Sequence, residues 1–175
     1  MAQYVYKALD ENKQAIRLMT ILPALCQEDE LVCILSHARL TQTDVPTFEA
    51  LSYTWGDDTN PSRLRLSSSR DEGIDVTRNL REALPYLRYT DKPRVMWIDA
   101  VCINQQDKSE RGQQVQRMGH IYTLAERVVI WLGVGDFSSQ LIMETCKELN
   151  CKVNTNIDGY GTIKSRTQNP LEAHW

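Results

Sequence analysis

The pattern of apolar and polar positions predicts a series of short strands in the first half of the chain. Segments 16–22, 31–35 and 48–55 are rich in aliphatic or aromatic residues and are bounded by Pro, Gly and acidic residues, as β-strands typically are. Segments 64–66 and 74–76 flank a polar loop that contains glycine, which predicts a short hairpin.

Two later segments, 95–103 and 128–132, are almost continuously apolar, which is typical of strands covered on both faces. Asp99 places a carboxylate inside the first of them. A carboxylate there is costly unless it is paired or lies at the exposed carboxyl end of the strand, where ligands bind in open α/β sheets. Two interpretations of Asp99 therefore stay open: it fixes the following loop, or it belongs to a functional site.

Apolar residues at helical spacing predict three helices, over 80–87, 115–125 and 141–149. Thr77 is the expected N-cap of the first helix, and Pro85 is expected to kink its last turn. On the third helix, Glu144 lies opposite the apolar stripe, which is typical of a solvated surface position.

The alternation of strands and helices from residue 48 onward predicts an α/β fold with a central, mostly parallel sheet and right-handed crossovers. The first 45 residues are expected to add antiparallel strands at an edge. We expect the domain core to span 1–150, and 151–175 to hold a polar loop and the start of a helix at Asn169-Pro170. Since the sequence stops just after that start, it predicts a fragment of a longer chain.

Composition excludes several classes of protein. The 175 residues are 42% hydrophobic and 25% charged, which excludes disorder or low complexity over the whole chain. The chain carries 20 Lys and Arg against 23 Asp and Glu, a net charge of −3, which argues against nucleic acid or a membrane surface as partner. It contains neither a signal-peptide pattern nor the roughly 20 consecutive apolar residues of a membrane span. A cytoplasmic location is expected.

Residue types that bind metals or carry out common chemistry form no recognisable pattern. The five Cys and three His residues lack metal-ligand spacing, so no metal is expected. P-loop and hydrolase-elbow motifs are absent, and Gly133-Val-Gly135 lacks the third glycine of a dinucleotide fingerprint. Cys102 lies in an apolar run and is interpreted as an inert core thiol. Asp107 and Glu110 have the spacing of a capping box, which favours a structural role for Glu110.

Several blocks of the sequence resemble the HET (heterokaryon incompatibility) domain of fungi. In chain order these blocks are Ala15–Pro23 (AIRLMTILP), Phe48–Asp57 (FEALSYTWGD), Asn79-Leu80, Trp97–Gln105 (WIDAVCINQ), Glu110-Arg111, Gln114-Val115, Met118, Ile121-Tyr122 and Trp131–Gly133 (WLG). The resemblance covers roughly residues 14–135. It implies a module of a larger receptor-like chain that acts in fungal non-self recognition and triggers programmed cell death when incompatible cells fuse.

A second similarity is to TIR domains. It is carried by Leu51–Tyr53 with Gly56-Asp57, Leu80 and Leu84, Trp97–Asp99, Arg111-Gly112 and Val128–Ile130, which follow the order of elements in that fold. The resemblance implies a TIR-like, flavodoxin-like sheet with helices on both faces. It places the glutamate of the NAD-hydrolysing members at or beside Glu144.

The TIR resemblance also suggests roles for other residues. The catalytic carboxylate would be Glu144, or Glu110 if its loop folds inward, with Asp99 as a third candidate. Trp55 would stack on a planar ring, with Ser52 and Gly56 in the same turn. Asp99, Asn104 and Gln105 would bind ribose hydroxyls. Arg111 would also belong to the ligand-binding residues.

Two functions stay open at this point. The first is an NAD-consuming death effector that requires no cofactor and uses NAD as its substrate. The second is a non-catalytic signalling module that self-associates through residues 104–113 and the following helix. Both imply self-association and a regulatory or receptor partner in a larger chain. Neither function implies binding to nucleic acid or to a membrane.

Overall fold

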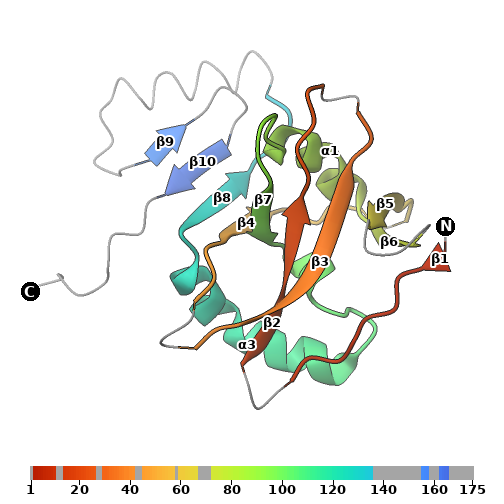
Figure 1. Ribbon diagram of the computed structural model, residues 1–175, viewed down its shortest axis with the longest axis vertical. Helices are drawn as coiled ribbons and strands as arrows, with labels where there is room; N and C mark the ends of the chain where they lie inside the picture. Colours follow the sequence, from red (N-terminus) through yellow and green to blue (C-terminus); the bar gives the residue numbers. More distant parts are fainter. Residues whose placement is uncertain are drawn as a thin grey trace, which may run out of the picture.

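The computed structural model describes residues 2–10, 14–26, 29–41, 45–57, 59–66, 72–135, 155–157 and 162–165. Within these residues the chain forms an α/β fold (Figure 1). The strands are β1 (Ala2–Gln3), β2 (Ala15–Ile21), β3 (Val32–Arg39), β4 (Glu49–Tyr53), β5 (Ser62–Leu66), β6 (Glu72–Val76), β7 (Arg94–Trp97), β8 (Arg127–Trp131), β9 (Thr155–Ile157) and β10 (Thr162–Ser165). The helices are α1 (Arg78–Leu87), α2 (Asp99–Cys102) and α3 (Lys108–Leu124).

The strands form one mixed sheet in the order β1-β6-β5-β3-β2-β7-β4-β8-β10-β9. Four of the strand pairings are parallel and five are antiparallel, so the expectation of a mostly parallel sheet is wrong. The antiparallel pair β2–β3 is present as predicted, but it lies inside the sheet, between β5 and β7, and not at an edge. Strand β2 pairs with β3 on one side and with β7 on the other, and these two pairings place it inside the sheet; six of its seven residues are buried.

Strands β7, β4 and β8 are mutually parallel and adjacent, in that order. Their carboxyl ends therefore lie at the same edge of the sheet, which we call the carboxyl edge and define by the last residue of each strand: Tyr53, Trp97 and Trp131. The chain passes from β4 through β5, β6 and α1 to β7, and then through α2 and α3 to β8. That helices cover both faces of a flavodoxin-like sheet stays a prediction.

The apolar run 95–103 is not one strand, contrary to the sequence-based expectation. Strand β7 ends at Trp97, and the next residues form the single helical turn α2, in which Cys102 N–H donates to the Ile98 carbonyl at 2.7 Å. Val101 and Cys102 are as completely buried in this turn as they would be in a strand. A buried helical turn can therefore have the same run of apolar residues as a buried strand.

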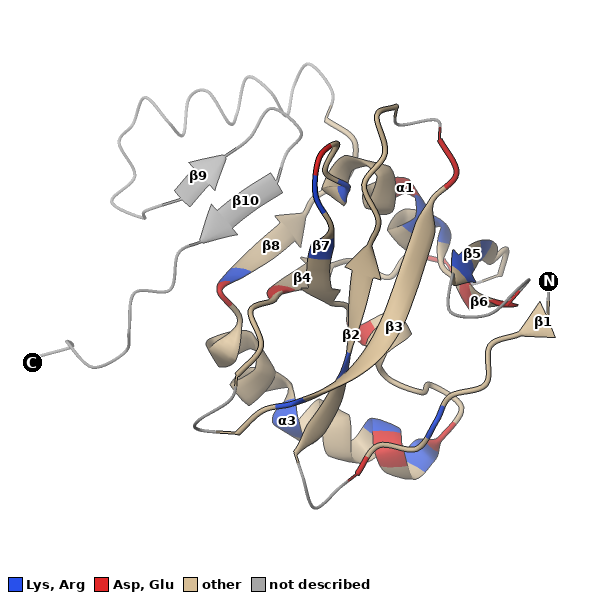
Figure 2. Ribbon diagram, viewed as in Figure 1, with Lys and Arg blue, Asp and Glu red and all other residues tan. Residues whose placement is uncertain are grey.

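The first two predicted helices are confirmed. Helix α1 buries the expected stripe, and the Thr77 hydroxyl accepts a hydrogen bond from Leu80 N–H, as predicted for its N-cap. Pro85 removes a backbone donor two residues before α1 ends. Helix α3 contains the second stripe, but Val115 is 52% exposed and the first turns bury polar side chains, Glu110 and Gln114, instead. Figure 2 shows charged residues on these first turns, and also on loops, on α1 and on several strands.

The segment 150–169, expected to be a polar loop, contains the strands β9 and β10. They form an antiparallel hairpin that pairs with β8 through β10. The helix predicted over 141–149 and the helix start at Asn169-Pro170 lie outside the described residues. The division of the chain at residue 150 stays a prediction.

Candidate functional site

Trp55 and Asp99 meet at the carboxyl edge, although 44 positions separate them in the chain. Trp55 follows β4 by two residues, and Asp99 is the first residue of α2, just after β7. The indole Nε1–H of Trp55 donates to Asp99 Oδ2 at 3.0 Å. Since Trp55 remains 41% exposed, part of its indole is open to solvent.

The loop after β7 fixes the position of Asp99. Ala100 N–H donates to Asp99 Oδ1 at 2.7 Å, and the Gln105 side-chain amide donates to the Asp99 carbonyl at 2.9 Å. The carboxylate is therefore held at both oxygens, one by the loop backbone and one by the indole of Trp55. Asp99 therefore lies just beyond the carboxyl end of β7, and it is half-buried there.

Burial raises the pKa of Asp99 above its ordinary value, and the hydrogen bonds from Trp55 and Ala100 oppose that rise. The charge of Asp99 also affects the pKa of two tyrosines. Burial, followed by this charge, raises the pKa of Tyr122 to about 12, and the same two causes raise the pKa of Tyr53. The carboxylate thus sits in a partly desolvated environment, where charges act strongly on their neighbours.

The turn that presents Trp55 requires a glycine at position 56. Gly56 has φ +72°, and a Cβ atom there would lie 2.7 Å from Asn79 Nδ2. That amide approaches closely because it donates to the Thr54 carbonyl at 3.0 Å, which ties the end of β4 to the first turn of α1. The Trp-Gly pair and the later Asn therefore form one structural unit, which sets the position of the indole.

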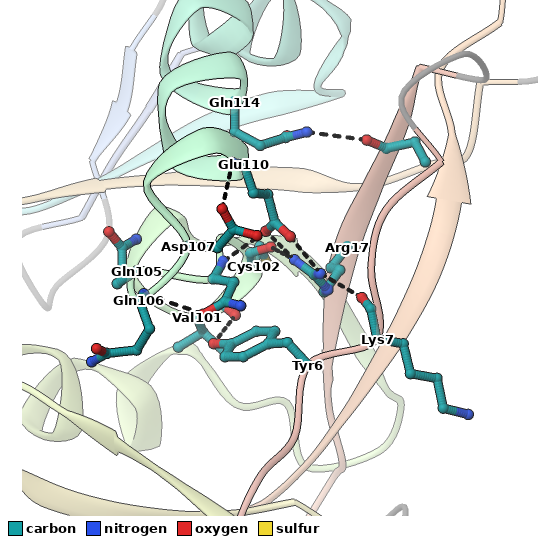
Figure 3. Close-up of polar contacts among 12 residues, drawn as sticks. Tyr6, Lys7, Arg17, Val101, Cys102, Gln105, Gln106, Asp107, Glu110 and Gln114 are labelled. Atoms are coloured by element: carbon teal, nitrogen blue, oxygen red, sulfur yellow. Dashed lines mark hydrogen bonds and ion pairs between the residues drawn. The ribbon is translucent and has the colours of Figure 1, made fainter.

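Glu110, a candidate catalytic carboxylate, is instead part of a buried ion pair (Figure 3). Its two carboxylate oxygens accept hydrogen bonds from Arg17 Nη1 and Nη2 at 2.5 and 2.9 Å. Oε1 also accepts the N–H of Asn104 at 2.7 Å. Asp107 caps α3 as predicted by accepting the N–H groups of Ser109 and Glu110, but Glu110 turns toward Arg17 and does not complete the capping box. These contacts favour a structural role for Glu110.

Arg17 joins the N-terminal segment to the loop after β7. Its guanidinium donates to the carbonyl of Lys7 at 2.6 Å and to that of Cys102 at 3.1 Å, and it lies 4.8 Å from the centre of the Tyr6 ring. The Tyr6 hydroxyl donates to the Val101 carbonyl at 2.9 Å. Arg17 is not among the site residues predicted from the sequence, although a charge inside an apolar strand is a signal for a residue of this kind.

The remaining candidates lie in different places. Asn104 is near Asp99 in sequence, but its Oδ1 accepts the N–H of Gln106 at 3.2 Å and so supports the loop. Ser52 is half-buried within β4, and Arg111 is exposed on α3. Glu144 lies outside the described residues. The structure therefore brings together Trp55, Asp99 and Gln105 by direct hydrogen bonds.

Two further observations concern other kinds of site. Cys102 is 1% exposed, which confirms that it lies in the core, and burial raises the pKa of its thiol to about 12, which favours an unreactive thiol. In the described part of the chain, no group of three or more His, Cys, Asp and Glu side chains could hold a metal ion. No helix in that part is long and apolar enough to cross a membrane.

Comparison with known proteins gives one consistent answer. Residues 48–173 match the family described as heterokaryon incompatibility protein (HET). The chain is also 34% identical over 152 residues to heterokaryon incompatibility protein 6, OR allele, from Neurospora crassa; the match covers 81% of this chain and 22% of that protein. The chain thus spans about a fifth of the length of this curated relative. No solved structure matches it.

Proposed function

Because this chain belongs to the HET (heterokaryon incompatibility) family, we propose that it is an effector module of fungal non-self recognition that leads to programmed cell death. The Neurospora relative is a heterokaryon incompatibility protein, which supports a role in incompatibility. That relative is far longer than the matched region, which supports a regulatory or receptor partner within a larger chain.

We further propose that the module hydrolyses NAD at the carboxyl edge and needs no other cofactor. The observation that carries this proposal is the half-buried carboxylate of Asp99 bound to the part-exposed indole of Trp55. Cleavage of the bond between nicotinamide and ribose passes through an oxocarbenium-like state, which a carboxylate stabilises. In this scheme Trp55 and Asp99 hold the nicotinamide side of NAD, and Glu144 is the carboxylate beside the ribose.

The arrangement of strands supports a TIR-like, flavodoxin-like core. Across the sheet these strands lie in the order β7, β4, β8, whereas along the chain the order is β4, β7, β8. Numbered along the chain, they therefore lie in the order 2-1-3, which is how the flavodoxin-like order begins. Trp97 pairs in register with Ala50, and Trp131 with Tyr53, so the two indoles point to opposite faces. Trp97 packs on Tyr122 of α3 and Trp131 on Tyr86 of α1, which supports helices on both faces.

The test is to incubate the purified chain with NAD over a range of protein concentrations and to measure free nicotinamide. Glu144→Gln is expected to lower kcat by about 100-fold, in the range expected when one electrostatic stabiliser is removed. Asp99→Asn is expected mainly to raise KM. Glu82→Gln, at an exposed ion pair on α1, should change neither constant and serves as the control. Absence of nicotinamide at every concentration would contradict the proposal.

The second candidate function is a non-catalytic module that self-associates through α3. Val115 is 52% exposed, and the glycines at 112 and 119 have no atom within 4 Å of an added Cβ, which leaves this helix face open. Sedimentation at increasing concentration is expected to show oligomers that disappear in Arg111→Glu. A strict monomer at all concentrations would exclude this function, whatever the outcome with NAD.

A further inference from the structure

We propose that Trp55 and Asp99 form a binding site for a planar aromatic cation, such as a pyridinium ring, at the carboxyl edge. This inference deepens the proposed function, since NAD carries its nicotinamide as a pyridinium, and it rests on that function only for the identity of the natural ligand. The binding property itself follows from the geometry and charge of the two side chains.

The aromatic part of the site is an oriented indole. The hydrogen bond from Nε1 to Asp99 Oδ2, at 3.0 Å, fixes one edge of the Trp55 side chain, while 41% of the residue remains exposed. The turn at Gly56, locked by the Asn79 amide, fixes its backbone. An exposed indole held at both its backbone and its ring nitrogen is preorganised for stacking, because little side-chain entropy is lost on binding. Its place at the ends of adjacent parallel strands is where ligands bind in open α/β sheets.

The charge of the site is negative and uncompensated. Within the described residues, neither Asp99 nor Asp57, two positions after Trp55, forms an ion pair with a Lys or Arg. The oxygens of Asp99 accept N–H groups, including those of Trp55 and Ala100, and those of Asp57 accept the backbone N–H and the hydroxyl of Thr59. A carboxylate that lacks a countercharge and is partly desolvated attracts a cation at this edge.

The hydrogen bond between the two residues links charge and ring. The face of a Trp indole carries partial negative charge and is the strongest aromatic partner for a cation. A carboxylate that accepts the indole N–H increases this negative charge on the ring face. A neutral ring of the same shape would gain the stacking contact but not the charge interaction. The site therefore distinguishes a pyridinium from a neutral pyridine, which is the difference between NAD and the nicotinamide that leaves it.

The experiment compares two probes of nearly the same shape, 1-methylnicotinamide, a cation, and nicotinamide, which is neutral. Binding is followed by the NMR signal of the Trp55 indole N–H, assigned by its loss in Trp55→Phe. The cation is expected to bind about tenfold more tightly. Asp99→Asn keeps an oxygen that can accept the indole N–H but removes the charge. It should therefore reduce the preference to the part that the indole face alone supplies, and leave nicotinamide affinity unchanged. Asp75→Asn, a matched change at an exposed carboxylate of β6, should alter the preference less than about twofold because solvent and salt screen its charge.

A measurement on the unmodified chain guards against loss of folding in Asp99→Asn. Added salt should weaken binding of the cation and leave that of nicotinamide unchanged. Equal affinities for the two probes, or a preference that Asp99→Asn leaves unchanged, would overturn the inference. The probe preference without any cleavage of NAD would leave this site standing and reject the hydrolase proposal. Cleavage of NAD without the preference would reject this site alone.

Discussion

Replacing Glu110 by Gln is expected to lower the free energy of unfolding by about 3–5 kcal/mol, the usual cost of breaking a buried ion pair from one side. The side chain of Arg17 is 0% exposed and that of Glu110 is 10% exposed. Gln keeps the size and one acceptor oxygen but removes the charge, which leaves the Arg17 guanidinium uncompensated. It also weakens the hydrogen bond that Asn104 N–H donates to Oε1.

Urea denaturation measures this effect, with Glu82→Gln as the matched control. Glu82 also pairs with an arginine, Arg78, but their side chains are 45% and 79% exposed. Exposed pairs four residues apart on a helix contribute about 0.3–0.5 kcal/mol, so the control should lose no more than that. A loss of less than about 1 kcal/mol in Glu110→Gln would show that this pair contributes little to the fold, contrary to what its burial implies.

Sequence reasoning succeeded where the signal is local. The stripe of α1, its cap at Thr77 and the hairpin of β5 and β6 each depend on residues close together in the chain, and all three are found in the structure. Helical spacing also located α3, but it placed Val115 in the core, where the structure has Gln114 instead. Gln114 can be buried because its amide donates to the Ala15 carbonyl at 3.2 Å, a partner 99 positions away that no local pattern reveals.

The errors in the fold come from contacts between distant segments. Strand β2 pairs with β7, where Met19 lies opposite Met96, and this pairing places the N-terminal hairpin inside the sheet. An apolar strand of this kind can be central or can lie at an edge, and only its partners decide. The prediction of a single strand over 95–103 was wrong for a different reason, because a buried helical turn and a buried strand have the same apolar composition.

The candidate site was predictable in its members but not in its contacts. Trp55 and Asp99 were both singled out from the sequence, yet nothing in it shows that the indole donates to that carboxylate. Glu110 was interpreted either as a capping residue or as a catalytic one, since its charge partner, Arg17, lies 93 positions earlier. Ion pairs between remote elements leave no spacing to detect, so the capping-box pattern was the only local signal for Glu110.

Glu49→Gln is expected to cost about 3–5 kcal/mol at pH 7, and this cost should shrink as the pH falls. Glu49 begins β4 and lies between two arginines. It accepts hydrogen bonds from Arg94, one of them from Nε at 2.9 Å, and from Arg127 Nη2 at 2.5 Å. Burial alone would raise the pKa of Glu49, but the hydrogen bond from Arg127 and the charge of Arg94 hold it below its ordinary value of 4.5.

A carboxylate whose pKa is lower in the folded state stabilises the fold above its unfolded pKa, and this stabilisation is lost as the pH falls through the folded pKa. The difference in unfolding free energy between the wild type and Glu49→Gln should therefore be constant near pH 7. It should decrease below about pH 4.5, where the protonated Glu49 becomes neutral like Gln. Urea midpoints between pH 7 and pH 3 measure this. Asp75→Asn, at the exposed pair with Arg63, should show only a small difference throughout. Glu49, Arg94 and Arg127 are the first residues of β4, β7 and β8. A cost for Glu49→Gln that stays unchanged down to pH 3 would mean that the charge of Glu49 does not stabilise the start of these three strands.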